Sequence, residues 1–399
     1  MRRIYLDHNA TTPVRPEVLE AMLPFFRERF GNASSIHAFG QAARAPVEEA
    51  RAQAARLLGA RPGEVFFTSG GTESDNLAIK GVAYANRGRG SHIITSQIEH
   101  HAVLNSCQFL EQEGFTVTYL PVDSDGLVDP DDVARTITDR TILVSIMHAN
   151  NEIGTIQPVE EIGRIARERG VFFHTDAVQS AGKLPIEVDA MYIDLLSISG
   201  HKLYGPKGVG AVYIRKGTQI VQTAHGGHHE GDVRAGTENT PGIVGLGKAA
   251  ELAFIEREAE AQHLTQLRDL LQRRLLDEID DIRVNGHPTR RLPGTLNVSF
   301  TAAEGESLIL SLDLKGIAVS SGSACTSGSL EPSHVLLALG LDPQLAQTSV
   351  RFSFGRDNTR EDVEDVMEHL PEIVARLRAM SALTVKQEKI RGSGFGVRG

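Results

Sequence analysis

The chain has few of the residues and segments that mark secreted or membrane proteins. It contains two cysteines among 399 residues, Cys107 and Cys325, which cannot form a disulfide framework and indicate a reducing compartment. No apolar stretch approaches about 18 residues, so a membrane-spanning helix is excluded. The N-terminal sequence MRRIYLDHNATTP lacks the apolar region of a secretory signal. We therefore expect a cytoplasmic protein that makes no membrane contact.

Basic residues are also in deficit. The 41 Lys and Arg against 51 Asp and Glu give a formal charge of −10. Because no basic stripe supplies contacts to phosphates, nucleic acid is not expected as a partner. Apolar residues make up 41% of the chain and charged residues 23%, as in an ordinary globular protein. A chain of this length buries roughly 75% of its unfolded surface and is expected to divide into two domains.

Short apolar runs alternate with helical patterns along the first part of the chain, which is typical of an α/β fold with a largely parallel sheet. The expected strands span residues 64–69, 91–96, 116–122, 141–147, 171–176, 193–199 and 210–215. Several of them are continuous apolar runs, as expected of strands covered on both faces.

The pattern changes after residue 215. Leucines and isoleucines from Leu264 to Ile282 repeat at intervals of three and four and predict a long amphipathic helix. Two strands are expected at TLNVSF and GIAVSS, and a last helix at about 360–379. We place the large domain at residues 15–255, a smaller α+β domain at 1–14 and 256–385, and a loose tail at 386–399.

Polar residues follow two of the predicted strands. Lys202 lies in SISGHKLYGPKGVG and Asp176 in VFFHTDAVQS, and in open α/β sheets ligands bind at such strand ends. A lone lysine in a Gly-rich loop is usually solvated, and a lone aspartate is usually a cap or turn residue. Together they match pyridoxal phosphate, which needs a lysine for a Schiff base and an acid for its pyridinium nitrogen.

Three other segments carry weaker signals. In TSGGTESDN a Gly-Gly turn precedes a predicted helix, with Thr72 and Asp75 in a capping-box variant; the helix N-terminus could bind a phosphate, and a plain βα turn fits equally well. His100 and His101 could stack on a ring or move protons, although adjacent histidines are more often surface or cap residues. The segment HGGHHE at 225–230 lacks the spacing and cysteine ligands of a zinc site, so no metal site is expected.

The two cysteines lie in contrasting sequence contexts. Cys325 is surrounded by Ser, Gly and Thr in SSGSACTSGSLEPSH, which is typical of a mobile loop. Cys107 lies at helical spacing from Val103 and Leu110, which predicts an inert core thiol. A loop thiol suits a group that enters an active site and then leaves it, although its position alone also fits an unimportant cysteine.

In combination these segments resemble the pyridoxal-phosphate-dependent cysteine desulfurases of the NifS/IscS group, within the class-V aminotransferases. The resemblance implies the PLP fold type I, in which a large domain with a mostly parallel seven-stranded sheet carries a smaller α+β domain. It covers residues 5 to about 356. The matching blocks, in the family's order, are YLDHNATTPVRPEV, TSGGTESDN, EHHAV, MHANNEIGTIQP, HTDAVQSAGK, SISGHKLYGPKGVG, RAGTENTP, SSGSACTSGSLEPSHVL and VRFSFGR.

The resemblance also implies a role for individual residues. Lys202 would hold the cofactor, Asp176 would pair with its ring nitrogen, and His100 would stack on the ring and relay protons. Gln179 and Asn151 would contact the ring hydroxyl or nearby groups, and Arg351 and Asn32 would hold the substrate carboxylate. The residues implied for the phosphate are Gly71, Thr72, Ser199 and His201, with Thr237 reaching the phosphate of the other subunit in a homodimer.

Cys325 would be the nucleophile of this reaction. It would take the sulfur of L-cysteine as a persulfide, leave L-alanine, and pass the sulfur to an acceptor such as an iron–sulfur cluster scaffold. The same thiol is considered as a transient iron–sulfur ligand. The alternatives are an aminotransferase or β-eliminating lyase of the same fold, neither of which needs a loop thiol, and a non-catalytic assembly scaffold.

Two details refine the resemblance. Ala33 stands where the family commonly has proline, which should loosen that loop slightly. The segment GDVRAGTENTPGIVG is closer to the nitrogen-fixation branch than to the housekeeping branch, and SACTSGSLEPSHVLLALGL resembles the group with an extended cysteine loop.

Overall fold

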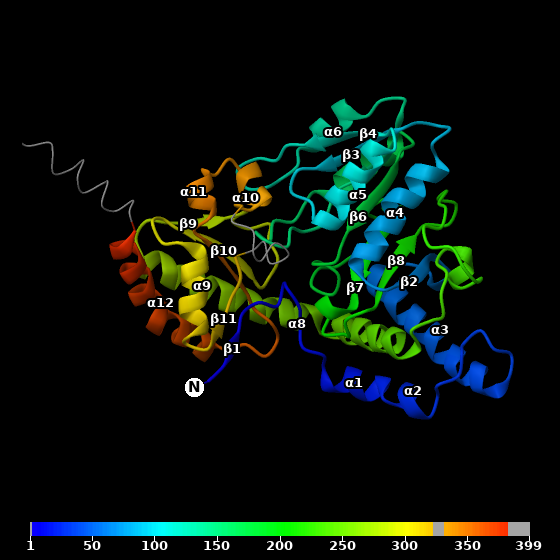
Figure 1. Cartoon of the computed structure of the whole chain (residues 1–399), viewed down its shortest axis with the longest axis horizontal. Helices are drawn as coiled ribbons and strands as arrows, with labels where there is room; N and C mark the ends of the chain where they lie inside the picture. The colour runs from blue at the N-terminus through cyan, green and yellow to red at the C-terminus, as the bar shows by residue number, and fades with distance from the viewer. Residues whose placement is uncertain (1, 322–330, 382–399) are drawn as a thin grey trace, which may run out of the picture.

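The largest sheet has seven strands in the order β2-β8-β7-β6-β5-β3-β4 (Figure 1). The structure is a computed structural model that describes residues 2–321 and 331–381. All neighbouring strands run parallel except β8, which is antiparallel to both β2 and β7. The strands are β2 (Val65–Thr68), β3 (His92–Ser96), β4 (Thr116–Leu120), β5 (Thr141–Ser145), β6 (Phe172–Asp176), β7 (Leu195–Ser199) and β8 (Gly210–Ile214). Each lies inside one of the predicted segments, so the mostly parallel sheet is confirmed.

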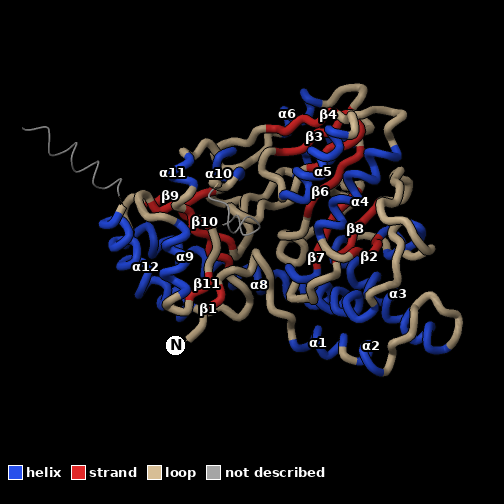
Figure 2. The backbone as a smooth tube through the Cα atoms, viewed as in Figure 1, coloured by secondary structure: helices blue, strands red, loops and turns tan. Residues whose placement is uncertain are grey.

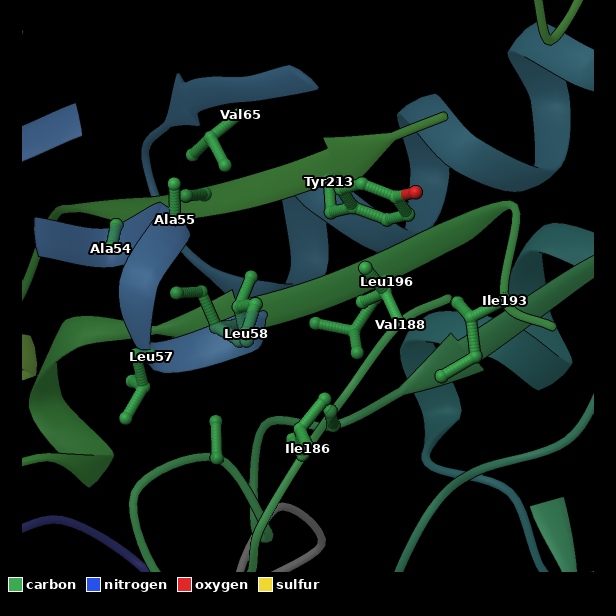
Figure 3. Packing of buried hydrophobic residues seen from close by; sticks show 14 of the residues in the cluster. Ala54, Ala55, Leu57, Leu58, Val65, Ile186, Val188, Ile193, Leu196 and Tyr213 are labelled. Atoms are coloured by element: carbon green, nitrogen blue, oxygen red, sulfur yellow. The ribbon is translucent and has the colours of Figure 1, made fainter. Parts of the chain in front are cut away.

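Helices cover both faces of this sheet. Neighbouring residues of a strand point to opposite sides, so apolar residues at successive positions need cover on both faces. In β7, Leu195 packs in the cluster built with α4 (Gly71–Ala85) and α5 (His101–Gln112), whereas Leu196 packs in the cluster built with α3 (Ala38–Leu58) and α7 (Val159–Glu168). Figure 3 shows part of the α3 side, with labelled α3 residues facing labelled strand residues. Burial on both faces explains why several of these strands are continuous apolar runs in the sequence.

A second set of strands lies at the other end of the molecule (Figure 2). The antiparallel strands β12 (Ser349–Ser353), β10 (Thr295–Phe300) and β9 (Ile282–Asn285) form one sheet, and β1 (Ile4–Tyr5) pairs in parallel with β11 (Ile317–Ala318). Helices α9 (Gly305–Asp313) and α12 (Arg360–Met380) share a core with these strands. The β1–β11 pair therefore brings the N-terminus to the C-terminal part of the chain.

One helix, α8 (Thr240–Glu278), connects the two cores. Leu246 near its start belongs to the core of the large sheet, and Leu271 near its end belongs to the core of the second sheet. The predicted domain boundary at residue 255 falls inside this helix, and the domain division stays a prediction. The helix predicted through Ile282 was too long, because Asp281 has a φ of 52° and turns the chain into β9.

The remaining helices are short, and the predicted elements of the C-terminal part are present. TLNVSF forms β10, GIAVSS contains β11, and α12 matches the predicted last helix. In the two described ranges, no helix is long and apolar enough to cross a membrane. The predicted tail at 386–399 lies outside the described residues. The short helices are α1 (Pro16–Met22), α2 (Pro24–Arg27), α6 (Pro130–Thr136), α10 (His334–Ala338) and α11 (Pro343–Ala346).

Candidate functional site

The carboxyl ends of the parallel strands open into a cavity of about 340 Å³. This edge of the sheet is where open α/β folds bind their ligands. Ten residues that the sequence predicted for the site line this cavity together: Gly71, Thr72, His100, Asn151, Asp176, Gln179, Ser199, His201, Lys202 and Arg351. They come from segments as far apart as residues 71 and 351, so the fold gathers them into one place.

Lys202 lies in a short 3-10 turn, Gly200–Lys202, directly after β7. Its Nζ donates hydrogen bonds to the carbonyl oxygens of Asn9 at 2.5 Å and Ala10 at 2.6 Å. Asn9 also lines the cavity, and its carbonyl accepts a hydrogen bond from Gln179 Nε2 at 2.9 Å. Asn9 had no predicted role, although it belongs to the matching block YLDHNATTPVRPEV. The N-terminal segment therefore holds the lysine and the glutamine in fixed positions.

Asp176 is the last residue of β6 and is 6% exposed. Its Oδ1 accepts a hydrogen bond from the Val178 N–H at 2.9 Å. Burial raises the pKa of Asp176, while the Val178 N–H and the charge of Lys202 lower it. A cationic partner in the cavity would stabilise the charged form of this buried carboxylate. A pyridinium N–H is such a partner.

The turn between β2 and α4 presents a helix N-terminus to the cavity. The predicted capping box is wrong: α4 begins after Gly70 without a side-chain cap, and Glu73 instead accepts the N–H of Ser69 at 2.7 Å. A Cβ on Gly71 would come within 2.6 Å of Val178 Cγ2, so the turn packs close to the end of β6. Helix N–H groups that no side chain caps are suited to a phosphate.

Asp75 is the second residue that sequence reasoning missed at this site. The capping-box interpretation assigned it to the helix start, but it is 1% exposed, lines the cavity, and lies 3.6 Å from His174 Nε2 through Oδ1. Burial and the nearby charge of Asp176 raise the pKa of Asp75 well above its usual value. Two carboxyl groups at one buried site cannot both ionise without cost, so Asp75 favours the protonated form.

His100 caps the start of α5, where its Nδ1 accepts the Ala102 N–H at 3.1 Å. Because Nδ1 acts as an acceptor, the ring proton of the neutral form is on Nε2. Burial, with a smaller contribution from the charge of Lys202, lowers the pKa of His100 to about 4. A neutral imidazole at the cavity wall can stack on a flat ring and donate a hydrogen bond from Nε2–H.

Arg351 lies in β12 and is 1% exposed. Its guanidinium donates to Asp7 Oδ1 at 2.7 Å and to the carbonyl oxygen of Asn151 at 2.9 Å. These contacts fix the orientation of a cation that lines the cavity. A guanidinium fork held in this way fits the carboxylate of an amino acid.

Two predicted residues within the described ranges are not part of this cavity. Asn32 and Thr237 are exposed on the surface and do not line it. Cys325 lies outside the described residues. Cys107, in contrast, is a fully buried free thiol on α5, and burial raises its pKa to about 12. The prediction of a core position is therefore confirmed for Cys107, and its lack of reactivity stays a prediction.

Comparison with known proteins identifies the family of this fold and site. The class-V aminotransferase family matches residues 4–366. The cysteine desulfurase IscS of Methanosarcina thermophila is 58% identical over 386 residues, which cover 97% of this chain and 95% of that protein. The cysteine desulfurase IscS of Dictyoglomus turgidum is 56% identical over 380 residues, which cover 95% of this chain and 96% of that protein.

Solved structures agree with this result. A NifS-like protein superposes with a TM-score of 0.88 at 42% identity, and the match covers 94% of this chain and 100% of that one. A structure titled SspA in complex with cysteine has a TM-score of 0.80 at 42% identity, and the match covers 88% of this chain and 98% of that one. The PLP fold type I expected from the sequence is thereby confirmed. The chain belongs to the class-V aminotransferase family and, within it, to the cysteine desulfurases.

Proposed function

We propose that this protein is a pyridoxal-phosphate-dependent cysteine desulfurase that converts L-cysteine to L-alanine and carries the sulfur as a persulfide on Cys325. One observation carries the proposal. Lys202 and Asp176, from neighbouring strand ends, line the same cavity as the uncapped N-terminus of α4. A Schiff-base lysine, an acid for the ring nitrogen and a phosphate site are the three groups that this cofactor requires.

The residues of the cavity fit pyridoxal phosphate. Asp176 would hold the ring nitrogen, Asn151 and Gln179 the ring hydroxyl or nearby groups, and His100 would stack on the ring. Gly71, Thr72, Ser199 and His201 would bind the phosphate. When bound, the cofactor supplies an electron sink for the substrate amino acid. The chain's own contribution is to orient these groups and to exclude water from a buried carboxylate.

Arg351 and Asn32 would bind the carboxylate of the substrate. Arg351 already has its guanidinium fixed by Asp7 and Asn151, so little side-chain entropy is lost when a carboxylate binds. His100 would relay the proton that moves as the amino acid is processed, with Nε2–H as the donor. The lowered pKa of His100 keeps this ring neutral, and because the Ala102 N–H occupies Nδ1, the ring proton on Nε2 can be donated to the bound substrate.

Sulfur transfer requires a thiolate, and Cys325 is the residue we assign to it. The Cys325 thiolate attacks the substrate sulfur, a sulfur–sulfur bond forms, and the substrate Cβ–S bond breaks. The electron pair of that bond returns to the substrate carbon skeleton, which takes up a proton and becomes alanine. Cys107 is unsuitable because its buried thiol stays protonated. The persulfide on Cys325 then passes to an acceptor such as an iron–sulfur cluster scaffold.

The proposal extends to the protein's assembly and location. Exposed Thr237 would complete the phosphate site of a second subunit in a homodimer, and the protein would work in the cytoplasm. The large domain at 15–255 would hold the cofactor. The small domain at 1–14 and 256–385 would place Arg351 over it. The likeness of GDVRAGTENTPGIVG to the nitrogen-fixation branch remains a prediction about this segment.

The direct test is anaerobic incubation with L-cysteine, measuring alanine and sulfide together with a reductant present. Equal amounts of both are expected. Pyruvate and ammonia in place of alanine would show a β-eliminating lyase, and an inert protein without a visible cofactor band would show a scaffold. Borohydride reduction and peptide mapping should place the pyridoxyl label on Lys202, and Lys202→Ala should abolish that label. A label on another lysine would overturn the assignment.

A further inference from the structure

The segment at residues 225–237, which we call the His-Gly loop, has an unusual backbone. Three consecutive residues have left-handed φ angles: Glu230 at 48°, Gly231 at 61° and Asp232 at 66°. Side chains on Glu230 and Asp232 disfavour this conformation, so neighbouring structure must hold the loop in it. The loop lies beside β2 and α4 (Figure 1) and ends at Thr237.

A buried ion pair supplies that hold. Arg51 of α3 donates to both carboxylate oxygens of Glu230, at 2.8 and 2.9 Å, and the two side chains are 12% and 3% exposed. The Glu230 carboxylate also accepts the backbone N–H of Phe67 at 2.7 Å, and Arg51 donates to the carbonyl of Val65 at 2.7 Å. A two-pronged pair with backbone contacts on both sides fixes position as well as charge.

A second ion pair ties the same loop to the predicted phosphate turn. Arg234 Nε donates to Glu73 Oε1 at 2.8 Å, and the other oxygen of Glu73 accepts the N–H of Ser69. Ser69 directly precedes the turn that opens α4. The two pairs therefore bind the His-Gly loop to β2 at one point and to the start of α4 at another, with Thr237 only three residues beyond Arg234.

We infer that the Arg51–Glu230 pair is a positioning device that holds Thr237 where it completes the cofactor-phosphate site of a second subunit. This inference rests on the proposed function, in which Thr237 contacts the phosphate across a dimer interface. Glu230 and Arg51 line a cavity separate from the cofactor cavity, so they act through the loop and not on the cofactor itself. The defect caused by losing the pair should consequently appear in the opposite subunit.

Hybrid dimers test this directly. One chain carries Lys202→Ala and cannot attach the cofactor covalently, so borohydride fixes a pyridoxyl label only on the other chain. Glu230→Gln is then placed on either chain, and the label on the Lys202 chain is measured against pyridoxal phosphate concentration. With Glu230→Gln on the Lys202→Ala chain, half-maximal labelling should need about tenfold more cofactor, as for one lost hydrogen bond to a charged group. On the Lys202 chain, Glu230→Gln should leave labelling unchanged.

The controls separate this inference from a general loss of stability. Glu168→Gln removes the partner of Arg164 in an exposed pair on α7. On either chain it should leave the cofactor concentration for half-maximal labelling unchanged. If Glu230→Gln unfolds the chain, Arg51→Lys keeps the charge but loses the fork and should give the same asymmetry with a smaller shift. A shift on the variant's own chain, or on neither chain, overturns the inference. If Thr237→Ala on the Lys202→Ala chain has no effect, the cross-subunit contact itself fails.

Discussion

At the residue scale, buried carboxyl groups near the cavity decide how the protein responds to pH. Glu99 is fully buried, and its Oε1 accepts hydrogen bonds from Ser96 Oγ at 2.6 Å and from the Met147 N–H at 3.0 Å. Its other oxygen, Oε2, is buried and has no hydrogen-bond partner among the residues that the structure describes. Burial raises the pKa of Glu99 to about 8. The folded chain therefore binds this proton more tightly than the unfolded chain does.

This difference predicts a pH dependence of the apoprotein. The stabilising effect of the Glu99 proton is complete below the unfolded pKa of about 4.3 and is lost as pH rises toward the folded pKa. Across that window the free energy of unfolding should fall by about 1.4 kcal/mol per pH unit for one such group. In Glu99→Gln, which is permanently neutral, the fall should be shallower. Urea unfolding at pH 5 and pH 8 measures this, with exposed Glu113→Gln as the control. Parallel profiles for wild type and Glu99→Gln would refute the prediction.

The two cysteines give the second residue-scale prediction. Cys325→Ser should retain the bound cofactor and its visible band but release no sulfide, because a hydroxyl cannot accept the sulfur. Cys107→Ser should keep most of the desulfurase activity and lose about 1–3 kcal/mol of stability, because it buries a hydroxyl without a partner. Mass spectrometry after cysteine treatment should find the added sulfur on the Cys325 peptide. Added sulfur on Cys107 would contradict the persulfide assignment.

At the element scale, local pattern predicted the fold best where burial is complete. Several of the seven strands of the large sheet, such as β5, were found because both faces are covered and their sequences are mostly apolar. Strands β1, β9 and β12 were missed: β1 has only two residues, β9 is short and half-buried, and β12 carries Arg351 in its centre. No local pattern signals that this arginine is buried, because its partner Asp7 lies 344 residues away in sequence.

The site shows the same limit. Residues at strand ends, such as Lys202 and Asp176, could be predicted because topology alone brings strand ends together. Asn9 and Asp75 could not, since one depends on the N-terminal segment crossing the sheet edge and the other on which face of α4 is buried. Their roles follow from tertiary contacts to Lys202 and His174.

The helix α8 allows an element-scale prediction with a matched control. Leu271 is fully buried in the second core, whereas Leu276 on the same helix is 51% exposed. Leu271→Ala should lower the free energy of unfolding by about 2–5 kcal/mol through lost burial and the remaining cavity. Leu276→Ala should change it by less than about 0.5 kcal/mol, since surface substitutions away from packed sites cost little. Denaturant unfolding of both variants measures the difference. Equal losses of unfolding free energy would contradict the packing of Leu271 in the second core.

At the scale of the whole molecule, the surface around Asn32 indicates a partner. Six large apolar side chains between residues 19 and 39 are 49% to 93% exposed: Leu19, Leu23, Phe26, Phe30, Ile36 and Phe39. The rings of Phe30 and Phe39 lie 5.9 Å apart, and exposed apolar side chains concentrated in one short segment favour an interface there. Asn32, assigned to the substrate carboxylate, lies among them and outside the cofactor cavity. A second subunit that covers this surface would explain why these six side chains are exposed in the single chain. It would also explain why Asn32 lies outside the cofactor cavity of its own chain.

The resulting prediction concerns assembly and activity together. Sedimentation should give a mass twice the 43.2 kDa of the chain, and activity should fall on dilution as dimers dissociate. Ile36→Ser combined with Phe39→Ser should raise the dimer dissociation constant by more than about tenfold, because each side chain loses buried apolar area. Leu314→Ser, at a residue that is 79% exposed in the C-terminal part, should leave it unchanged. A fully active monomer would refute the dimer and would return Asn32 and Thr237 to the status of ordinary surface residues.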